Sequence, residues 1–469
     1  METALDYAER HFDRFLSELS AYLRIPSVST LSNNRPNMER AAAWTADRLR
    51  AIGLSQVEII PTAGWPIVYG EWLGAPQAPT VLIYGHYDVQ PAEPLEAWDQ
   101  DPFEPILADE HIVARGAADD KGQLFVNFAA LESLCAASGG SFPLNIKFIV
   151  EGEEEIGSHS LIAFVQTNRD RLHADAIVIS DTTMLSLEQP AISTAFRGLL
   201  AFDLQITGPA FDLHSGQHGG VIHNPIQALC EIIAALHHPD GSVAVPGFYD
   251  KVQFLDEAQR RELAGLYSEE ELRRETGAPC SWGESDYNLR ERIVARPTLE
   301  INGIAGGWAG DGGKTVLPAR ALAKISCRLV PDQDPAEIET LIRRQIEKLT
   351  PPTVRFQLRT YNHSYPIVLP DANPAIQIAM EAYERGFGVR PILMRKGGSL
   401  PILSVFARTL AAPIVLAGYG LPSDRVHGPN ERFHLACFRR GIHTAIYLYD
   451  GLRQLNATTP PSDSRASEG

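Results

Sequence analysis

Cysteine is scarce in this chain, which has 469 residues and only five cysteines. The five are widely spaced and no two form a C-x-x-C pair: Cys135, Cys230, Cys280, Cys327 and Cys437. An odd number of scattered cysteines argues against a disulfide framework and against a thiolate zinc site. The simplest compartment for such a chain is the cytoplasm, so we expect a cytoplasmic protein.

Long apolar runs and an excess of basic residues are also missing. No run reaches the length of a membrane span, and the first ten residues lack the basic start and apolar stretch of a secretory signal. The 41 lysines and arginines face 58 aspartates and glutamates, which gives a formal net charge of −17. This balance disfavours nucleic acids and anionic membranes as partners. We therefore expect a soluble protein with a well-hydrated surface.

The length and the apolar pattern predict an α/β architecture with more than one domain. A chain of this size exceeds what one hydrophobic core usually supports. Apolar residues at helical intervals predict an amphipathic surface helix from Asp6 to Leu23, which Pro26 stops. Short strands rich in valine and isoleucine follow, separated by helical stretches, and the clearest are 80–84, 145–150 and 175–179. Strands that alternate with helices indicate an α/β sheet.

The pattern changes after Arg197, where long strands with alternating polarity begin. Residues 198–207 and 321–330 are typical of half-exposed antiparallel strands. The pattern of alternating strands ends around 353–360. A helix from Pro374 to Arg385 and a strand at 413–416 then return to the earlier pattern of apolar strands and helices. We therefore expect one domain formed by 1–195 and 364–456, an inserted domain at 196–363, and a disordered tail at 457–469.

Four segments place metal-ligand types of side chain just after predicted strands, where open α/β sheets gather their sites. They carry His86 with Asp88, Glu154 with Glu155, Asp181, and His427. Taken singly, a histidine in such a place is usually an ordinary polar residue near a turn. An acidic run such as 153–155 is likewise usually a solvated helix start. Because four such cases recur in one chain, we interpret them together as a metal centre.

Asp119, in the run 115–122, is the candidate bridge between two metal ions. Imidazole and carboxylate ligands suit ions such as zinc, and two closely spaced ions require one carboxylate that gives an oxygen to each. His86 would hold one ion, and Asp88 could accept the proton of the other ring nitrogen of His86. The alternative for Asp88 is an ordinary turn-forming residue.

This combination resembles the M20 family of metallopeptidases and amidohydrolases, and within it the dipeptidase branch. The matching segments follow the family order: 84–91, 98–105, 115–122, 151–158, 180–181, 212–216, 314–318, 397–399 and His427. Such an ordered set, which spans nearly the whole chain, is far more specific than any single motif. The resemblance implies a phosphorylase/hydrolase-like di-metal catalytic domain of α/β class with an inserted α+β lid or dimerisation domain.

The resemblance also implies the roles of the metal-site residues. It assigns two ligand sets that share one member: His86, Asp119 and Asp181 for one ion, and Asp119, Glu155 and His427 for the other. It makes Glu154 the general base, which takes the proton of a metal-bridging water and delivers it to the leaving amine, and it counts Asp88 among the catalytic residues. Zinc is the default ion, although manganese and cobalt suit the same ligands. In the family, the peptide bond at the position between Asp119 and Asp120 is cis.

The inserted domain contributes candidates for substrate binding. By itself, 211–219 is a glycine-rich turn with two histidines. The resemblance singles out His214, which in related dimers comes from the neighbouring subunit and hydrogen-bonds the oxyanion, so it implies a homodimer through the inserted domain. An arginine on a strand usually faces solvent, but the resemblance makes Arg328 the clamp for the substrate's C-terminal carboxylate. Four further residues would assist it: Thr315, Gly397, Gly398 and Ser399.

Two short motifs point to other chemistry and are set aside. Gly313-Lys-Thr315 suggests a phosphate-binding loop, but Trp308 stands where that motif needs its first glycine and Pro318 obstructs the helix that should follow. We expect this glycine stretch to be a loop. Residues 397–401 place a serine among small residues without the nucleophile-elbow pattern, so no serine hydrolase is indicated.

Three hypotheses for the function follow. The first is a two-metal peptidase that cleaves dipeptides or short peptides with a free C-terminal carboxylate. The second is an N-acyl amino acid amidohydrolase or deacylase with the same chemistry. The third is a catalytically dead binding or scaffold protein, whose signature would be the loss of ligands. Every expected ligand and the base are present, which favours an enzyme.

Overall fold

The computed structural model describes residues 2–455, and the tail expected to be disordered, 457–469, lies outside them. Two compact units make up the described chain. Unit 1 comprises the chain up to Thr194, Leu369–Met394, and the chain from Val405 onward, and unit 2 comprises Ala195–Val368 and Arg395–Ser404. The segment Arg395–Ser404 thus belongs to unit 2, whereas the sequence analysis placed it in the 364–456 part of the first domain.

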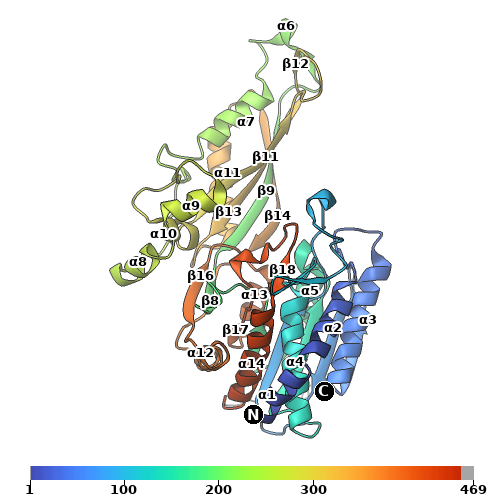
Figure 1. Ribbon diagram of the computed structural model, residues 1–469. Helices are drawn as coiled ribbons and strands as arrows, with labels where there is room; N and C mark the ends of the chain where they lie inside the picture. The colour runs from blue at the N-terminus through green and yellow to red at the C-terminus, as the bar shows by residue number, and fades with distance from the viewer. Residues whose placement is uncertain (1, 456–469) are drawn as a thin grey trace, which may run out of the picture. The chain divides into compact units, whose positions relative to one another are not determined.

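Unit 1 is built on a six-stranded sheet with the strand order β1-β2-β6-β3-β7-β17, of which Figure 1 labels the edge strand β17. Its strands are β1 (Gln56–Ile60), β2 (Ile67–Trp72), β3 (Thr80–His86), β6 (Asn145–Glu151), β7 (Ala176–Ile179) and β17 (Ile414–Leu416). β6, β3, β7 and β17 run parallel, whereas β1 and β2 pair antiparallel. The parallel strands are almost wholly buried, as expected where helices cover a parallel sheet. The predicted apolar strands are therefore confirmed.

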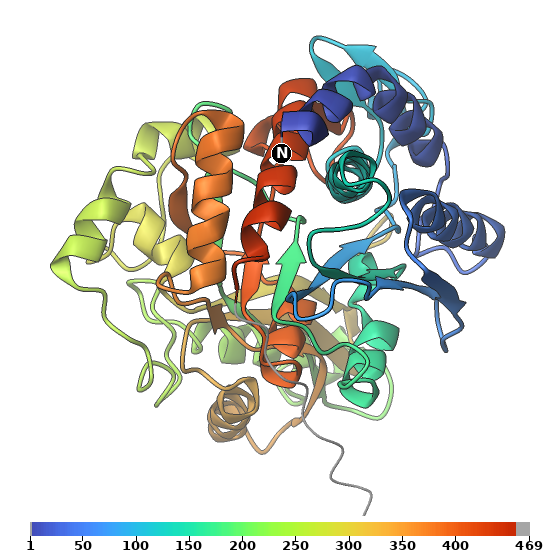
Figure 2. The same cartoon turned by 90° about the horizontal axis from the view of Figure 1, so that it is seen from below.

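The helices of unit 1 supply most of its core. They are α1 (Glu2–Arg10), α2 (Phe12–Leu23), α3 (Arg35–Ile52), α4 (Lys121–Ala137), α5 (His159–Thr167), α12 (Pro374–Phe387) and α14 (Leu435–Leu452). α4 is buried nearly all round because it packs against α1, α2, α3, α14 and β3. α12 lies beside α14, as Figure 2 shows in orange and red. Short elements complete the unit: η1 (Leu95–Ala97), β4 (Ile106–Ala108), β5 (His111–Val113), η2 (Glu154–Ile156), η3 (Pro422–Asp424) and β18 (Arg432–His434).

The first predicted helix is two helices in the structure. A break at His11 separates α1 from α2, because the φ of His11 is −108° and its Nδ1 lies 2.9 Å from the carbonyl oxygen of Tyr7. The ring thus bonds to the carbonyl of the preceding turn, and the backbone leaves the helical region. The amphipathic character is nevertheless confirmed, since Phe12, Phe15 and Leu19 are buried.

Unit 2 is built on a four-stranded antiparallel sheet with the order β11-β13-β9-β14. Its strands are β9 (Gly198–Thr207), β11 (Thr298–Gly306), β13 (Arg320–Leu329) and β14 (Arg355–Ser364). α7 (Pro225–Ala234) and α11 (Pro335–Leu349) share one apolar core with this sheet. Burial alternates along β13 and along most of β9, as the sequence predicts for half-exposed strands.

Smaller elements complete unit 2 and its junctions. They are β10 (Leu213–His214), α6 (Ser215–His218), α8 (Glu257–Ala264), α9 (Glu269–Thr276), α10 (Leu289–Val294), β12 (Val316–Leu317) and β15 (Ile367–Val368). Three elements begin in one unit and end in the other: β8 (Ala191–Phe196), β16 (Ile392–Lys396) and α13 (Pro401–Thr409). Residues 307–315 form a loop, as expected for the glycine stretch.

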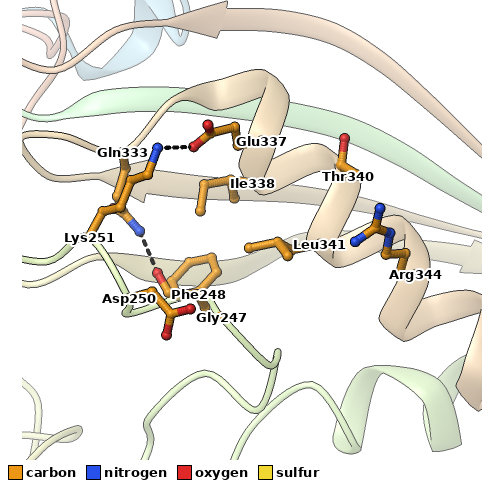
Figure 3. A pocket seen from close by; sticks show the side chains of 10 residues that line it. All are labelled: Gly247, Phe248, Asp250, Lys251, Gln333, Glu337, Ile338, Thr340, Leu341 and Arg344. Carbon is orange, nitrogen blue, oxygen red and sulfur yellow. Dashed lines mark hydrogen bonds and ion pairs between the residues drawn. The ribbon is translucent and has the colours of Figure 1, made fainter.

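A cavity of about 300 Å³ lies in unit 2 between α11 and the loop 247–251 (Figure 3). Phe248, Ile338 and Leu341 provide apolar walls, and an ion pair between Lys251 and Glu337 lies among its lining residues. None of the residues singled out in the sequence lines it. The structure also bears on the expectations about cysteines and membrane spans. All five cysteines are free thiols. No helix within residues 2–455 has the length and apolarity of a membrane span.

Candidate functional site

Five predicted ligands gather at one edge of the sheet in unit 1. His86 is the last residue of β3, Asp181 follows β7, and Glu155 lies in η2 just after β6. Asp119 lies two residues before the start of α4, and His427 lies between η3 and β18. Because parallel strands end at the same edge of a sheet, these distant parts of the sequence come together there.

The five residues form two groups that share Asp119. In each group the ligand atoms lie within 4.8 Å of one another, and the groups are His86 with Asp119 and Asp181, and Asp119 with Glu155 and His427. Asp119 Oδ1 lies 3.1 Å from His86 Nε2, and Asp119 Oδ2 lies 2.9 Å from His427 Nε2. One carboxylate thus turns one oxygen toward each histidine, which is the arrangement that a bridge between two cations requires.

The charge balance of this cluster favours bound cations. Burial, followed by the negative charge of Asp119, raises the pKa of Asp181 to about 7 and also raises the pKa of Glu155. Glu155 Oε1 is buried and accepts no hydrogen bond from the described residues. A cation would relieve the repulsion between the carboxylates and give this oxygen a partner. Two imidazoles with three carboxylates fit zinc, manganese or cobalt.

Each histidine turns its Nε2 atom toward Asp119. His86 Nδ1 lies 3.1 Å from the carbonyl oxygen of Asp88 and 3.3 Å from Oδ1 of the same residue, so Asp88 orients the ring. Burial opposes the charged form of His86, but hydrogen bonds to Asp119 and Asp88 outweigh it and raise the pKa of His86. Hydrogen bonds to Asp119 and Glu155 raise the pKa of His427 to about 10. A metal ion bound at either Nε2 would take the place of a proton on that atom.

The turn that carries Glu154 and Glu155 is held by Asp88. This fully buried carboxylate accepts the backbone N–H of Glu154 at 3.3 Å and that of Glu155 at 3.2 Å. Asp88 therefore orients His86 and also fixes the backbone of the predicted base and ligand. Burial is the first cause of the raised pKa of the Glu154 carboxylate, so this group takes up a proton more readily than an exposed glutamate does.

A neighbouring glutamate, which the sequence analysis left out, holds the same turn from the other side. Glu153 is buried and accepts hydrogen bonds from the backbone N–H groups of Trp65 and Ser160, both at 2.8 Å, and from the Ser160 hydroxyl at 3.0 Å. The three consecutive glutamates thus have three different environments. The sequence offers no signal for this difference, because the environment of Glu153 depends on Trp65, which lies 88 residues away in the chain.

The bond between Asp119 and Asp120 is a cis peptide, as expected from the resemblance. Asp120 is buried, and its Oδ2 accepts the backbone N–H of His86 at 3.3 Å. The two adjacent aspartates therefore face different partners. Asp119 faces both histidine rings, and Asp120 contacts the backbone of the strand that carries one of them.

In unit 2, the turn with His214 lies beside the segment that carries Thr315. β10 pairs with β12, with His214 opposite Val316, and the N–H of Ser215 donates to the Thr315 carbonyl at 3.1 Å. His214 is exposed, and its Nδ1 accepts the N–H of Gly216 at 3.0 Å. Because Nδ1 is the acceptor, the proton of the neutral ring is on Nε2, which is free to donate.

Arg328 lies on β13, and its guanidinium reaches the loop Gly397–Ser399. Nη1 of Arg328 donates to Ser399 Oγ at 2.8 Å, and this hydroxyl donates to the carbonyl of Arg197 at 2.5 Å. Burial alone accounts for the lowered pKa of Arg328, with no contribution from a neighbouring carboxylate. The remaining N–H groups of a partly buried guanidinium are therefore available to an anion.

Arg197 is a second guanidinium at this loop, and the sequence analysis did not single it out. Its Nε donates to the Gly397 carbonyl at 2.7 Å, and its backbone N–H donates to the Gly398 carbonyl at 3.1 Å. Burial, followed by the positive charge of Arg328, lowers the pKa of Arg197 to about 10. The structure thus groups Arg197 with four of the five expected substrate-binding residues: Arg328, Gly397, Gly398 and Ser399. The fifth, Thr315, was expected to assist Arg328 but instead contacts the His214 turn.

Known proteins share both the sequence pattern and the fold. The profile of Peptidase family M20/M25/M40 matches residues 82–449. Cys-Gly metallodipeptidase dug1 of Schizosaccharomyces pombe is 31% identical over 459 residues, which cover 94% of this chain and 96% of the relative. The crystal structure of human carnosine dipeptidase 1 matches with a TM-score of 0.83 and 29% identity, and covers 97% of this chain and 99% of that one.

A third relative extends this likeness beyond dipeptidases. The M20 family metallo-carboxypeptidase Sso-CP2 from Sulfolobus solfataricus matches with a TM-score of 0.84 and 29% identity over 94% of this chain and 99% of its own. The α/β unit with an inserted α+β unit is therefore the fold of these enzymes. The chain belongs to peptidase family M20/M25/M40, and it is a metallopeptidase.

Proposed function

We propose that this protein is a co-catalytic di-metal dipeptidase, which hydrolyses the amide bond of dipeptides or short peptides with a free C-terminal carboxylate. The observation that carries the proposal is the position of Asp119, whose two oxygens face His86 and His427 within two complete ligand groups. The names of the relatives, a Cys-Gly dipeptidase and a carnosine dipeptidase, support dipeptides as the substrate class. Two divalent ions per subunit, zinc by default, would complete the site.

The chemistry of the proposed reaction centres on Glu154. When bound, the two ions would polarise the scissile carbonyl and lower the pKa of the attacking water. Glu154 accepts the proton of that water and later gives it to the leaving amine. Burial supports this role, because it makes the carboxylate a stronger base than an exposed glutamate. Asp88 keeps Glu154 in place through its backbone N–H.

Substrate recognition in the proposal belongs to unit 2. The C-terminal carboxylate of the substrate binds Arg328, with the loop Gly397–Ser399 beside it, and Arg197 adds a second positive charge. Arg328 supports this assignment because a partly buried guanidinium without an ion-paired carboxylate calls for an anion. His214 donates its Nε2 proton to the oxyanion that forms during hydrolysis, which the tautomer set by Gly216 supports.

We further propose a homodimer formed through unit 2, in which His214 serves the neighbouring subunit. Large apolar side chains that are exposed in this unit support an interface there. Four of these side chains are Phe211, Val221, Ile304 and Trp308, with exposed fractions of 69%, 80%, 55% and 52%. Two of them flank His214 in sequence, so an interface that covers them brings His214 close to a second chain.

The proposal is tested by metal analysis combined with a substrate panel. The purified protein should bind two divalent ions per chain and should cleave alanyl dipeptides. Dipeptides with an amidated C-terminus should be poor substrates because Arg328 then lacks its anion. Faster cleavage of N-acetyl amino acids than of dipeptides would instead support the amidohydrolase hypothesis, and binding of dipeptides without any cleavage would support a catalytically dead relative.

A further inference from the structure

A buried ion pair contacts the loops of two proposed metal ligands and contains none of the ligands itself. Arg115 and Glu431 are each only 1% exposed, and Arg115 Nη1 donates to Glu431 Oε2 at 2.6 Å. Removing two charges from water is costly unless further hydrogen bonds satisfy both groups. The partners of these further hydrogen bonds therefore indicate what the pair does.

Glu431 holds the backbone of the Asp119 loop. Its Oε1 accepts the N–H of Ala118 at 2.9 Å and that of Asp119 at 3.1 Å, and its Oε2 accepts the N–H of Gly116 at 3.0 Å. Three amides of one loop thus converge on one carboxylate, and one of them belongs to the proposed bridging residue. The carboxylate fixes the backbone from which the Asp119 side chain extends.

Arg115 holds the backbone of the His427 loop. Its Nη2 donates to the carbonyl of His427 at 3.2 Å and to that of Pro91 at 3.1 Å, while its guanidinium lies over the ring of Trp98. The φ of His427 is 65°, a left-handed conformation that a non-glycine residue keeps only with support from its surroundings. The side chain of His427 is 55% exposed, so packing of the imidazole provides little of this support. The hydrogen bond from Arg115 to the His427 carbonyl is one such support for the backbone.

We propose that Arg115 and Glu431 are positioning residues that fix the distance between Asp119 and His427, and that they thereby determine the affinity of the metal site formed by Asp119, Glu155 and His427. This inference rests on the proposed di-metal function. The pair contacts only backbone atoms of Asp119 and His427 among the proposed ligands. Arg115 makes no hydrogen bond to His86 or Asp181, so its loss affects one metal site more than the other.

The substitution Arg115→Lys tests the inference while it retains the positive charge opposite Glu431. A lysine ammonium cannot reproduce the planar fork that reaches Glu431, Pro91 and His427 together. We expect one ion to bind as in the wild type and the affinity for the second to fall by about 10- to 100-fold. The measurement is zinc binding to the metal-free protein by equilibrium dialysis, with element analysis of the dialysed protein. Turnover should return when the zinc concentration is raised.

The matched control is Arg48→Lys, which alters another buried arginine of unit 1. Arg48 is 8% exposed and pairs with Glu132, and neither residue contacts a loop of the metal centre. This variant should have a lower melting temperature and should bind both ions with wild-type affinity. A merely structural role for Arg115 predicts the same result for Arg115→Lys.

The possible outcomes separate the inference from the proposed function. A wild-type protein that binds a single ion would contradict the di-metal function itself. A wild-type protein that binds two ions, together with an Arg115→Lys variant that binds both equally well, would contradict the positioning role alone. Glu431→Gln is the second variant. It should weaken the site formed by Asp119, Glu155 and His427, and it should also weaken the other site because both sites share Asp119. Unchanged zinc affinities in folded Glu431→Gln would overturn the inference as well.

Discussion

At the residue scale, Asp119 differs from the other proposed ligands because its two oxygens face two different histidines. We expect Asp119→Ala to lose both ions, whereas His86→Ala or His427→Ala should chiefly lose one, since each histidine belongs to a single group. Metal content per folded chain, measured by element analysis, decides this. The control is Asp170→Ala, which removes an exposed carboxylate from unit 1 and should leave two ions bound. Two tightly bound ions in Asp119→Ala would refute the bridging role.

Glu154 can be tested separately from metal binding. Glu154→Gln keeps the size of the side chain but cannot accept a proton from water. We expect both ions to stay bound while kcat for a dipeptide falls by about 10²- to 10⁴-fold, the usual contribution of a general base. Steady-state kinetics on protein with measured metal content checks this. A Glu154→Gln variant with two ions and full turnover would show that another group is the base.

At the element scale, the turn between β6 and η2 depends on close packing around Glu153. A Cβ atom on Gly64 would lie 1.6 Å from Oε1 of Glu153, so Gly64→Ala must displace the carboxylate that holds the turn. We expect a loss of stability of roughly 1–3 kcal/mol, as for overpacking elsewhere, together with a fall in turnover. Thermal unfolding and kinetics measure the two effects. Gly265→Ala, which adds its methyl group in open space, is the matched control and should change neither.

The elements themselves were largely predictable from the sequence. The strands at β3, β6 and β7 were predicted because a parallel sheet needs continuous apolar runs, and the long alternating strands of unit 2 because one face of an antiparallel sheet is exposed. The break at His11 was missed because it results from a side-chain hydrogen bond to Tyr7 rather than from a helix-breaking residue. The placement of Arg395–Ser404 in unit 2 was missed because only tertiary contacts reveal it.

In the candidate site, the proposed metal ligands could be predicted from the sequence, but the residues that support them could not. The ligand groups could be proposed because His86, Asp119 and Glu155 belong to short motifs with recognisable chemistry. The supporting residues could not, because Glu153, Arg197 and Glu431 act through backbone groups of distant segments. Glu431 stands only four residues after His427, which is the one sequence signal that could have drawn attention to it.

At the scale of the whole molecule, the proposed role of His214 in a dimer can be tested by mixing two inactive variants. His214→Ala and Glu154→Gln are each expected to have little activity. If His214 serves the neighbouring subunit, a mixed dimer contains one intact site, and random reassembly should restore about a quarter of the wild-type activity. The measurement is turnover after the two variants are unfolded and refolded together, with each refolded alone as the control. Absence of any restoration, in the presence of mixed dimers, would place His214 in its own subunit's site or outside catalysis.

The path of the chain between the two units affects how the protein can be recombined with its relatives. The chain passes from one unit to the other at 194–195, 368–369, 394–395 and 404–405. An exchange of residues 195–368 alone would therefore import Arg197 and Arg328 but leave the native loop Gly397–Ser399 behind. Chimeras that carry both segments from one parent should inherit that parent's recognition of the substrate carboxylate intact. The proposed anion-binding elements thus form one structural unit that is encoded by two separate segments of the sequence.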